Sequence, residues 1–183
     1  MDNKLILYIA MSLDGYIAER DGSIRFLDET PGPSPDLGYE KFYESVQAII
    51  LGGKTYRQVK NELSLDQWPY EGTPCYVCTR QQLPHDPNVR FTSLPPGRQL
   101  LQLVSQEHPG NIWLMGGGEI VRGFMRENLI DTYYIYVMPT VLGDGIPLFP
   151  AGFPKADLSL ESCQKIGEIV KIVYRRGAPR SYS

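Results

Sequence analysis

Two glycine-rich segments are the parts of this sequence best suited to hold a ligand. They are Gly52-Gly53-Lys54-Thr55 and Gly116-Gly117-Gly118-Glu119, and each follows an apolar run and precedes a helical pattern. The unpaired amides at the start of a helix attract anions, and glycine lets a phosphate approach the backbone closely. Two such junctions in one small sheet could hold the two ends of a dinucleotide. A tight turn explains either junction alone equally well.

Neither segment completes a familiar nucleotide-binding motif. Gly53-Lys54-Thr55 ends like a P-loop, but Ala48 occupies the position of the earlier glycine. Gly116-Gly117-Gly118 begins like a Rossmann fingerprint, but Val121 stands where its last glycine belongs. A nucleoside triphosphatase and a standard Rossmann domain are therefore both disfavoured.

Cys75 and Cys78 form a Cys-x-x-Cys spacing, which is a second candidate for chemistry. The segment around them reads as a strand, so we expect the two side chains on opposite faces. The sequence has two histidines, His85 and His108, and no second cysteine pair that would complete a zinc site. We therefore expect no metal centre, and the three cysteines fit a reducing compartment as unpaired thiols.

Composition and charge narrow the class of partner. The formal net charge of −3 argues against a nucleic-acid-binding surface, which needs clustered cations. No apolar run approaches membrane-spanning length, and the first residues do not resemble a signal peptide. We expect a cytoplasmic protein with no nucleic-acid or membrane partner, acting on a small molecule.

The apolar patterns predict an α/β fold with one sheet. Nearly continuous apolar runs such as residues 4–11 are typical of strands buried on both faces. Strands and helices alternate through the first two-thirds of the chain, and paired strands finish it. This pattern predicts a mixed, mostly parallel sheet with an antiparallel C-terminal edge, covered by helices on both faces. We expect one domain over residues 1–177 and a frayed tail at 178–183. Strands are predicted at 4–11, 47–51, 75–79, 89–91, 111–115, 131–138, 158–165 and 170–175, and helices at 35–46, 54–63, 98–106 and 119–127.

Four segments carry a family resemblance: Met11-Ser12-Leu13-Asp14-Gly15-Tyr16-Ile17-Ala18, Ile50-Leu51-Gly52-Gly53-Lys54-Thr55-Tyr56, Leu114-Met115-Gly116-Gly117-Gly118 and Pro139-Thr140-Val141-Leu142-Gly143-Asp144-Gly145-Ile146-Pro147-Leu148-Phe149. In this order and spacing they resemble the dihydrofolate reductase superfamily. The similarity is greatest to stand-alone relatives of the reductase domain of bifunctional riboflavin-biosynthesis proteins. The resemblance implies a dihydrofolate reductase-like three-layer α/β/α fold and an oxidoreductase that uses NADPH.

The resemblance also implies which positions contact the cofactor. Ala10 and Ile17 correspond to the residues that flank the nicotinamide, and Gly53, Lys54 and Thr55 to the phosphate cradle. Thr79 and Arg80 correspond to the region that holds the adenosine 2′-phosphate. The turn against the pyrophosphate and the nicotinamide ribose corresponds to Gly116, Gly117, Gly118, Glu119 and Ile120.

One departure from the family pattern bears on the coenzyme. Relatives usually have arginine where this chain has Gly53, and the loss of a guanidinium removes a bidentate phosphate contact. The preference for NADPH over NADH is therefore less firmly implied. Arg80 and Lys54 are candidates to compensate, and solvated surface cations are the other interpretation.

Two aspartates are candidate catalytic acids. Asp36 lies sixteen residues before Gly52, the separation that folate reductases keep between their catalytic carboxylate and the equivalent glycine. A first-turn helix acid explains Asp36 equally well. Asp14 belongs to the Leu-Asp-Gly turn of riboflavin-type reductases, and a plain turn aspartate is again the alternative.

The resemblance leaves the substrate open. Folate reductases place an arginine just before the third strand, whereas residues 70–74 here contain none, and the loop aromatic near the substrate is Phe26. The cysteine and histidine spacing of a zinc deaminase is absent from the sequence, so we expect no deaminase activity. We expect hydride transfer to a small pterin- or pyrimidine-like heterocycle, with Tyr39, Phe42 and Tyr43 either stacking on it or forming ordinary core. Dihydrofolate reductase proper and a non-catalytic dinucleotide-binding protein remain alternatives.

The closing strand is a candidate surface for self-association. Relatives pair as homodimers through an edge strand, and residues 170–174 are apolar enough to serve as one. The resemblance therefore predicts a homodimer.

Overall fold

The computed structural model describes residues 3–29, 37–63 and 67–177. The strands are β1 (Lys4–Ser12), β2 (Tyr16–Ala18), β3 (Val46–Gly52), β4 (Cys75–Cys78), β5 (Arg90–Thr92), β6 (Asn111–Gly116), β7 (Thr132–Met138), β8 (Ile146–Pro147), β9 (Leu158–Ile166) and β10 (Ile169–Arg176). The helices are α1 (Tyr39–Tyr43), α2 (Gly53–Gln58), α3 (Arg98–Glu107) and α4 (Gly118–Arg126), with a short 3-10 turn η1 (Arg25–Leu27) and a π-helical continuation of α2, η2 (Val59–Leu63). None of these helices is long and apolar enough to span a membrane.

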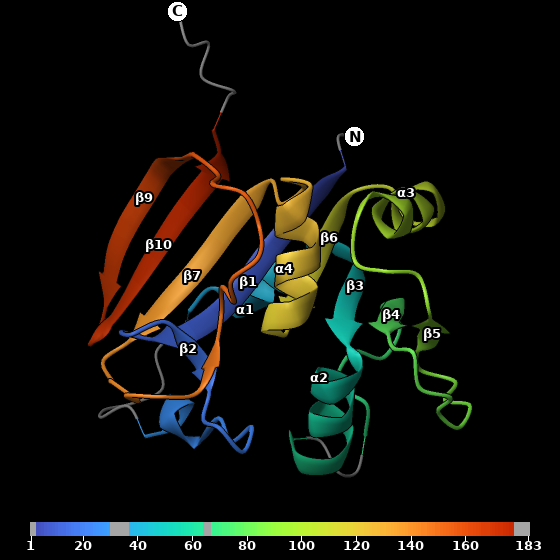
Figure 1. Ribbon diagram of the computed structural model, residues 1–183, viewed down its shortest axis with the longest axis horizontal. Coiled ribbons are helices and arrows are strands. Elements are labelled where there is room, and N and C mark those ends of the chain that lie inside the picture. Colours follow the sequence, from blue (N-terminus) through green and yellow to red (C-terminus); the bar gives the residue numbers. More distant parts are fainter. Residues whose placement is uncertain (1–2, 30–36, 64–66, 178–183) are drawn as a thin grey trace, which may run out of the picture.

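Eight of these strands form one sheet in the order β5-β4-β3-β6-β1-β7-β10-β9, while β2 and β8 pair separately (Figure 1). The first six strands in this order run parallel to their neighbours. The last two, β10 and β9, are antiparallel. The predicted mixed sheet with an antiparallel C-terminal edge is therefore confirmed, whereas the predicted frayed tail at 178–183 lies outside the described residues.

The opening strand, β1, lies near the middle of the large sheet. Leu7 in this strand pairs with Leu114 of β6 on one side and with Tyr133 of β7 on the other. All three side chains are fully buried. A strand covered on both faces needs an apolar side chain at nearly every position, which explains the continuous apolar run that predicted it.

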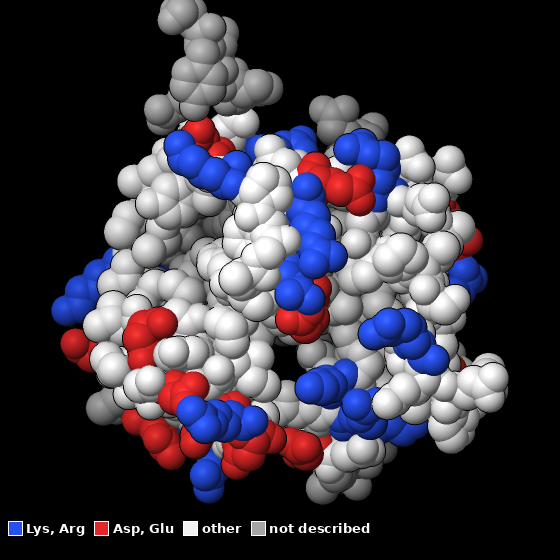
Figure 2. All heavy atoms as spheres, in the orientation of Figure 1, with Lys and Arg blue, Asp and Glu red and all other residues white. Residues whose placement is uncertain are grey.

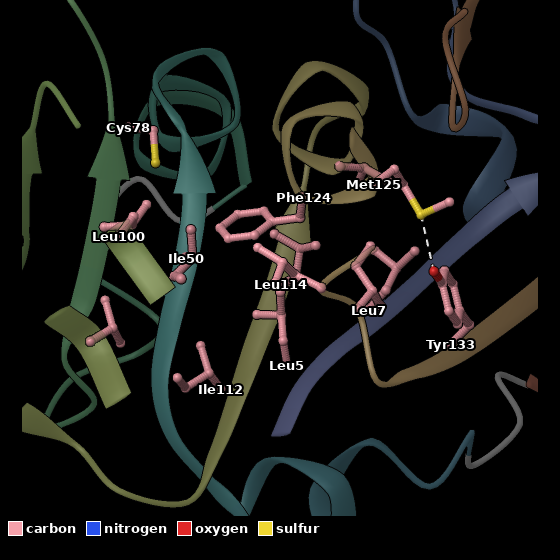
Figure 3. Close-up of a cluster of buried hydrophobic side chains, with 14 of the residues drawn as sticks. Leu5, Leu7, Ile50, Cys78, Leu100, Ile112, Leu114, Phe124, Met125 and Tyr133 are labelled. Atoms are coloured by element: carbon pink, nitrogen blue, oxygen red, sulfur yellow. Dashed lines mark hydrogen bonds between the residues drawn. The ribbon is translucent and has the colours of Figure 1, made fainter. Parts of the chain in front are cut away.

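One face of the sheet is covered by α3 and α4 (Figure 1). Figure 3 shows Phe124 and Met125 of α4 above the strand side chains Leu7 and Leu114. The Tyr133 hydroxyl donates a hydrogen bond of 3.0 Å to the Met125 sulfur, so its polar atom has a partner within this core. This packing fixes α4, and with it the glycine segment from which α4 begins.

The opposite face is aromatic and carries α1. Tyr8 of β1 stacks on Phe42 of α1 with ring centroids 4.2 Å apart, and both rings meet Trp113 edge-on. Phe26 is buried farther along this face beside Tyr136. Helices therefore cover both faces, as the sequence predicts.

The helix α1 is much shorter than the predicted helix over 35–46. It ends at Tyr43, and the Phe42 carbonyl accepts a hydrogen bond of 2.6 Å from the Ser45 hydroxyl. Val46 already belongs to β3 and pairs with Asn111 of β6, so strand pairing overrides the helical pattern there. The first two residues of the predicted helix, 35 and 36, lie outside the described residues.

The prediction that residues 170–174 form a sheet edge is wrong. They belong to β10, which pairs with β7 on one side and with β9 on the other. The edge strands of the large sheet are β9 and β5. Leu160 of β9 is 58% exposed, so β9 is the edge that presents apolar surface.

Truncation of Phe124 tests whether the α4 core dominates stability. Phe124→Ala is expected to lower the free energy of unfolding by about 3–5 kcal/mol, because it leaves a cavity under a fully buried ring. Urea denaturation measures the loss, with Leu160→Ala at an exposed position as the control. A loss no larger than the control's would contradict this account of the core.

Candidate functional site

Three parallel strands end side by side at one edge of the sheet. There β1 leads through a turn into the short strand β2, which carries Ile17; we call residues 13–18 the Ile17 loop. At the same edge β3 leads into α2, and β6 leads into α4. A Cβ atom built on Gly117 would lie 3.6 Å from Thr55 Oγ1 and 3.7 Å from Ile17 Cδ1. Thr55 and Ile17, about sixty and one hundred residues before Gly117 in the chain, thus lie close to it. We call the space between Gly117, Thr55 and Ile17 the glycine crevice.

The backbone at the crevice is shaped by glycine. Gly116 has φ of +112°, a conformation that other residues rarely adopt, and the Gly116–Gly117 peptide is cis. The Gly117 carbonyl accepts hydrogen bonds from Ile120 and Val121, which starts α4. No described side chain caps this helix start. Its first amides therefore suit an anion.

Glu119 stands at this anion-suited helix start, and its carboxylate is paired. Arg122, one turn later in α4, donates to Glu119 Oε2. The ion pair offsets a negative charge that would otherwise weaken phosphate binding. The neighbouring Ile120 closes the side toward α2, since a Cβ on Gly52 would lie 3.0 Å from its Cγ1.

A small strand pair holds the Ile17 loop against α4. In it, β2 pairs with β8, and the Leu148 amide donates 2.9 Å to the Gly15 carbonyl. A Cβ on Gly118 would lie 2.4 Å from the Pro147 carbonyl oxygen, so this close approach admits only glycine. This strand pair was not predicted, although Gly145-Ile146-Pro147 lies within one of the four segments that carry the family resemblance.

Asp14 fastens the same loop to residues 140–143. Its carboxylate accepts hydrogen bonds from the Ser12 hydroxyl at 2.6 Å and from the amides of Gly143 and Leu142 at 2.7 and 3.1 Å. The Ser12 hydroxyl, with these amides, holds the pKa of the Asp14 carboxyl below its ordinary value. A carboxylate that stays ionised is a poor proton donor. The geometry therefore favours the turn interpretation of Asp14 over a catalytic one.

The cationic side of the site lies where α2 meets the end of β4. A Cβ on Gly53 would lie 3.2 Å from Thr79 Cβ and Oγ1, so this helix start touches the loop after β4. Lys54 and Arg80 are exposed, and among the described residues no carboxylate pairs with either. Figure 2 shows a hollow between α4 and α2, with basic side chains gathered on its α2 side.

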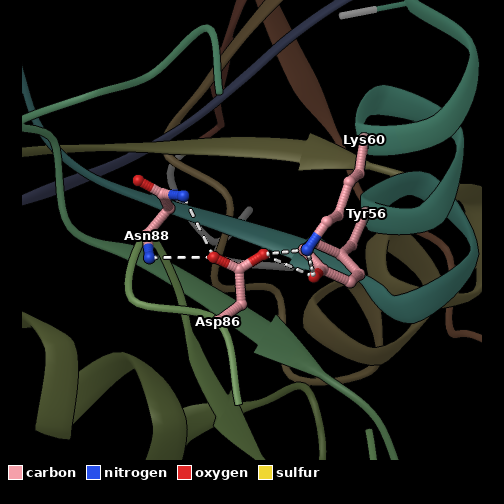
Figure 4. Close-up of polar contacts among 4 residues, drawn as sticks. All are labelled: Tyr56, Lys60, Asp86 and Asn88. Carbon is pink, nitrogen blue, oxygen red and sulfur yellow. Dashed lines mark hydrogen bonds and ion pairs between the residues drawn. The ribbon is translucent and has the colours of Figure 1, made fainter. Parts of the chain in front are cut away.

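A buried carboxylate joins α2 to the loop after β4 (Figure 4). Asp86 is 2% exposed and accepts hydrogen bonds from Lys60 at 2.6 Å and Tyr56 at 2.7 Å, and also from Asn88. Burial alone raises the pKa of Asp86, but these hydrogen bonds outweigh burial and hold the pKa well below its ordinary value. This link could not be recognised in the sequence, because Lys60 and Asp86 look like unrelated surface charges.

Aromatic side chains line the face on which Ala10 lies. Ala10 is half-buried and pairs with Tyr136 of β7, whose hydroxyl donates 2.6 Å to the Leu37 carbonyl. Of the three α1 aromatics, Phe42 and Tyr43 pack into the core beside Trp113, which supports the core interpretation for them. Tyr39 remains 38% exposed. It is the α1 aromatic best placed to stack on a ligand.

Asp36, the other candidate acid, lies outside the described residues. Its catalytic role therefore stays a prediction.

The Cys-x-x-Cys pair is split by the sheet, as predicted. Cys75 and Cys78 are both buried, and they belong to hydrophobic clusters on opposite faces. Burial raises the pKa of each thiol to about 12, which keeps them protonated. Over the residues that the structure describes, no group of three or more His, Cys, Asp or Glu side chains could hold a metal ion.

A cavity of about 350 Å³ lies between the loop after β2 and the end of α2. Gln58 crosses from α2 to donate 2.7 Å to the Gly22 carbonyl. Three carboxylates line this cavity, which makes it unsuitable for a pyrophosphate. Its lining residues are Asp21, Ser23, Ile24, Arg25, Asp28, Gln58, Glu62 and Leu63.

Comparison with known proteins identifies relatives over most of the chain. The sequence model of the family described as "RibD C-terminal domain" matches residues 3–172. The Bacillus subtilis protein YwjB is 42% identical over 177 residues, covering 96% of this chain and 99% of that protein. YyaP of the same organism is 27% identical over 184 residues, covering 93% and 94%.

Solved structures show the same fold. A crystal structure described as a putative riboflavin biosynthesis protein from Shewanella sp. PV-4 superposes with a TM-score of 0.81 at 27% identity, covering 97% of this chain and 100% of that one. RibD of Acinetobacter baumannii superposes with a TM-score of 0.67 at 17% identity, covering 96% of this chain and 58% of that one. The architecture is thus that of RibD reductase domains, which have the dihydrofolate reductase-like fold.

The link through Asp86 generates a prediction about stability and pH. Asp86→Asn is expected to lower the free energy of unfolding by about 1–3 kcal/mol at neutral pH, since it weakens hydrogen bonds to a charged group. Because the folded pKa lies below the unfolded value of about 3.9, the stabilisation is full above that value and is lost as pH falls through the folded pKa. The difference from wild type should therefore shrink on acidification.

Urea denaturation at pH about 7 and at several values below about 4 measures this difference. Asp28→Asn, at an exposed position, is the control. A difference between Asp86→Asn and wild type that stays constant with pH would contradict the assignment.

Proposed function

Because the chain belongs to the family of the RibD C-terminal domain, we propose that it is a riboflavin-type reductase homologue that uses NADPH to reduce a small pterin- or pyrimidine-like heterocycle. The family match supports a reductase of the riboflavin-biosynthesis type. The observation that carries the proposal is the glycine crevice. There a Cβ atom built on Gly117 would lie 3.6 Å from Thr55 Oγ1 and 3.7 Å from Ile17 Cδ1.

The residues around the crevice fit a dinucleotide. The open amides at the start of α4 and the absent side chain at Gly117 suit a pyrophosphate, while Lys54 and Arg80 supply positive charge at the α2 end. Ala10 and Ile17 would hold the flat ring at the end of β1. A bound NADPH supplies the hydride, and the protein supplies position and electrostatics.

The aromatic face next to Ala10 suits a flat heterocyclic substrate. Tyr39 offers a half-exposed ring there, and burial raises the pKa of its hydroxyl to about 12, so the ring stays neutral. Hydride transfer needs little side-chain chemistry beyond a proton source, and Asp36 remains the candidate for it. Asp14 serves instead to keep the Ile17 loop in place.

Location and assembly are further proposals. The three cysteines are free in the structure, which fits a cytoplasmic protein. A homodimer is proposed with β9 as its contact strand, because β9 is the exposed edge with apolar surface. A light-scattering mass of a single chain would contradict the dimer.

Alanine at Gly117 tests the crevice directly. The residue has φ of −71°, which any amino acid adopts, and the added methyl group meets Thr55 and Ile17 at ordinary contact distance. The fold should therefore survive, while NADPH binding is expected to weaken about tenfold or more, roughly 1.4 kcal/mol. The measurement is energy transfer from Trp68 and Trp113 to the reduced nicotinamide during titration.

The melting temperature of Gly117→Ala reports whether the variant is folded, and Ser159→Ala on β9 controls for substitution elsewhere. If wild type shows no saturable binding of NADPH or NADH, the reductase proposal fails. A Gly117→Ala protein that binds as tightly as wild type would remove the crevice as the binding place.

A further inference from the structure

Arg57 lies one helical turn after Gly53, on the same side of α2. That side faces the loop after β4, because a Cβ atom built on Gly53 would lie 3.2 Å from Thr79 Cβ and Oγ1. The Arg57 Nη1 atom donates 2.9 Å to the Gln81 side-chain oxygen. The Gln81 backbone N–H in turn donates a hydrogen bond of 3.1 Å to Thr79 Oγ1. The guanidinium is thereby held over the loop of residues 79–81.

This corner of the molecule carries positive charge without a balancing carboxylate. Within the described ranges, neither Arg57 nor Lys54 nor Arg80 forms an ion pair. The buried carboxylate in the following loop, Asp86, is already bound by Lys60. Figure 2 shows basic side chains gathered over α2 and the neighbouring loop. The corner therefore has charge available for an anionic ligand.

Arg57 has the geometry for a phosphate. A guanidinium has five N–H donors in a planar fork, and the bond to Gln81 uses one of them. That bond also fixes the side chain in place, which reduces the conformational entropy lost on binding. Lys54 and Arg80 are exposed and no hydrogen bond orients either among the described residues, so Arg57 is the cation already in position.

Resting on the proposed function, we propose that Arg57 recognises the 2′-phosphate of the adenosine half of the coenzyme and makes the protein prefer NADPH to NADH. Arg57 supplies the guanidinium from one turn after Gly53, where a Cβ atom would already lie 3.2 Å from Thr79. The inference names Arg57, beyond Lys54 and Arg80, as the residue that sets coenzyme preference.

The test uses two pairs of probes that differ only in the 2′-phosphate. They are NADPH against NADH, and adenosine 2′,5′-bisphosphate against AMP, titrated by calorimetry into wild type, Arg57→Ala, Arg57→Lys and Arg98→Ala. Arg98 starts α3 and pairs with Glu127, so Arg98→Ala removes one positive charge away from the site. Melting temperatures check that each variant is folded.

Arg57→Ala is expected to weaken both 2′-phosphorylated probes about tenfold or more, while NADH and AMP change less than about twofold. Arg57→Lys should fall between wild type and Arg57→Ala, because lysine keeps the charge and loses the fork. Arg98→Ala should bind all four probes as wild type does.

Equal weakening of the probes with and without the 2′-phosphate in Arg57→Ala, or no weakening of either, would overturn the inference. Those results leave the proposed function standing, since wild type still binds dinucleotide. Failure of wild type to bind NADPH or NADH would instead remove the proposed function and this inference with it.

Discussion

The parallel pairing of β3, β6 and β1 is the constraint on which the rest of the structure depends. Parallel strands end at the same edge of a sheet, so the segments that follow them are brought together whatever their separation in the chain. Pairing of Leu51 with Gly116 places the two glycine junctions side by side. The closeness of Gly117 to Thr55 and Ile17 follows from that register. A shift of one residue would turn every neighbouring side chain to the other face.

Much of the fold could be predicted from local pattern, and the departures have identifiable causes. Continuous apolar runs predicted the buried strands, because strands covered on both faces need apolar residues throughout. The pairing of the two closing strands was predicted, but local pattern does not show that β10, and not β9, is the one that pairs with β7. The early end of α1 depends on Val46 pairing with Asn111, a contact distant in sequence.

The candidate site was predicted in part for the same reason. Glycines at strand ends are visible in sequence, and Gly53 and Gly118 do lie at close approaches. Links formed by single side chains are not visible. Asp86 with Lys60, and Arg57 with Gln81, join residues more than twenty positions apart and match no motif. The two sides of the site also differ in chemistry: α2 offers cations, whereas the face beside Ala10 offers aromatic rings.

The most direct test of the central claim is hydrogen–deuterium exchange of the protein with and without NADPH. The account predicts slower exchange in three separate segments, residues 13–18, 52–58 and 116–121, because they surround the glycine crevice. The acidic cavity lined by Asp21, Asp28 and Glu62 should exchange as before, apart from its contact with α2. Protection confined to that cavity or to β9, with the three segments unchanged, would contradict a dinucleotide site at the carboxyl ends of β1, β3 and β6.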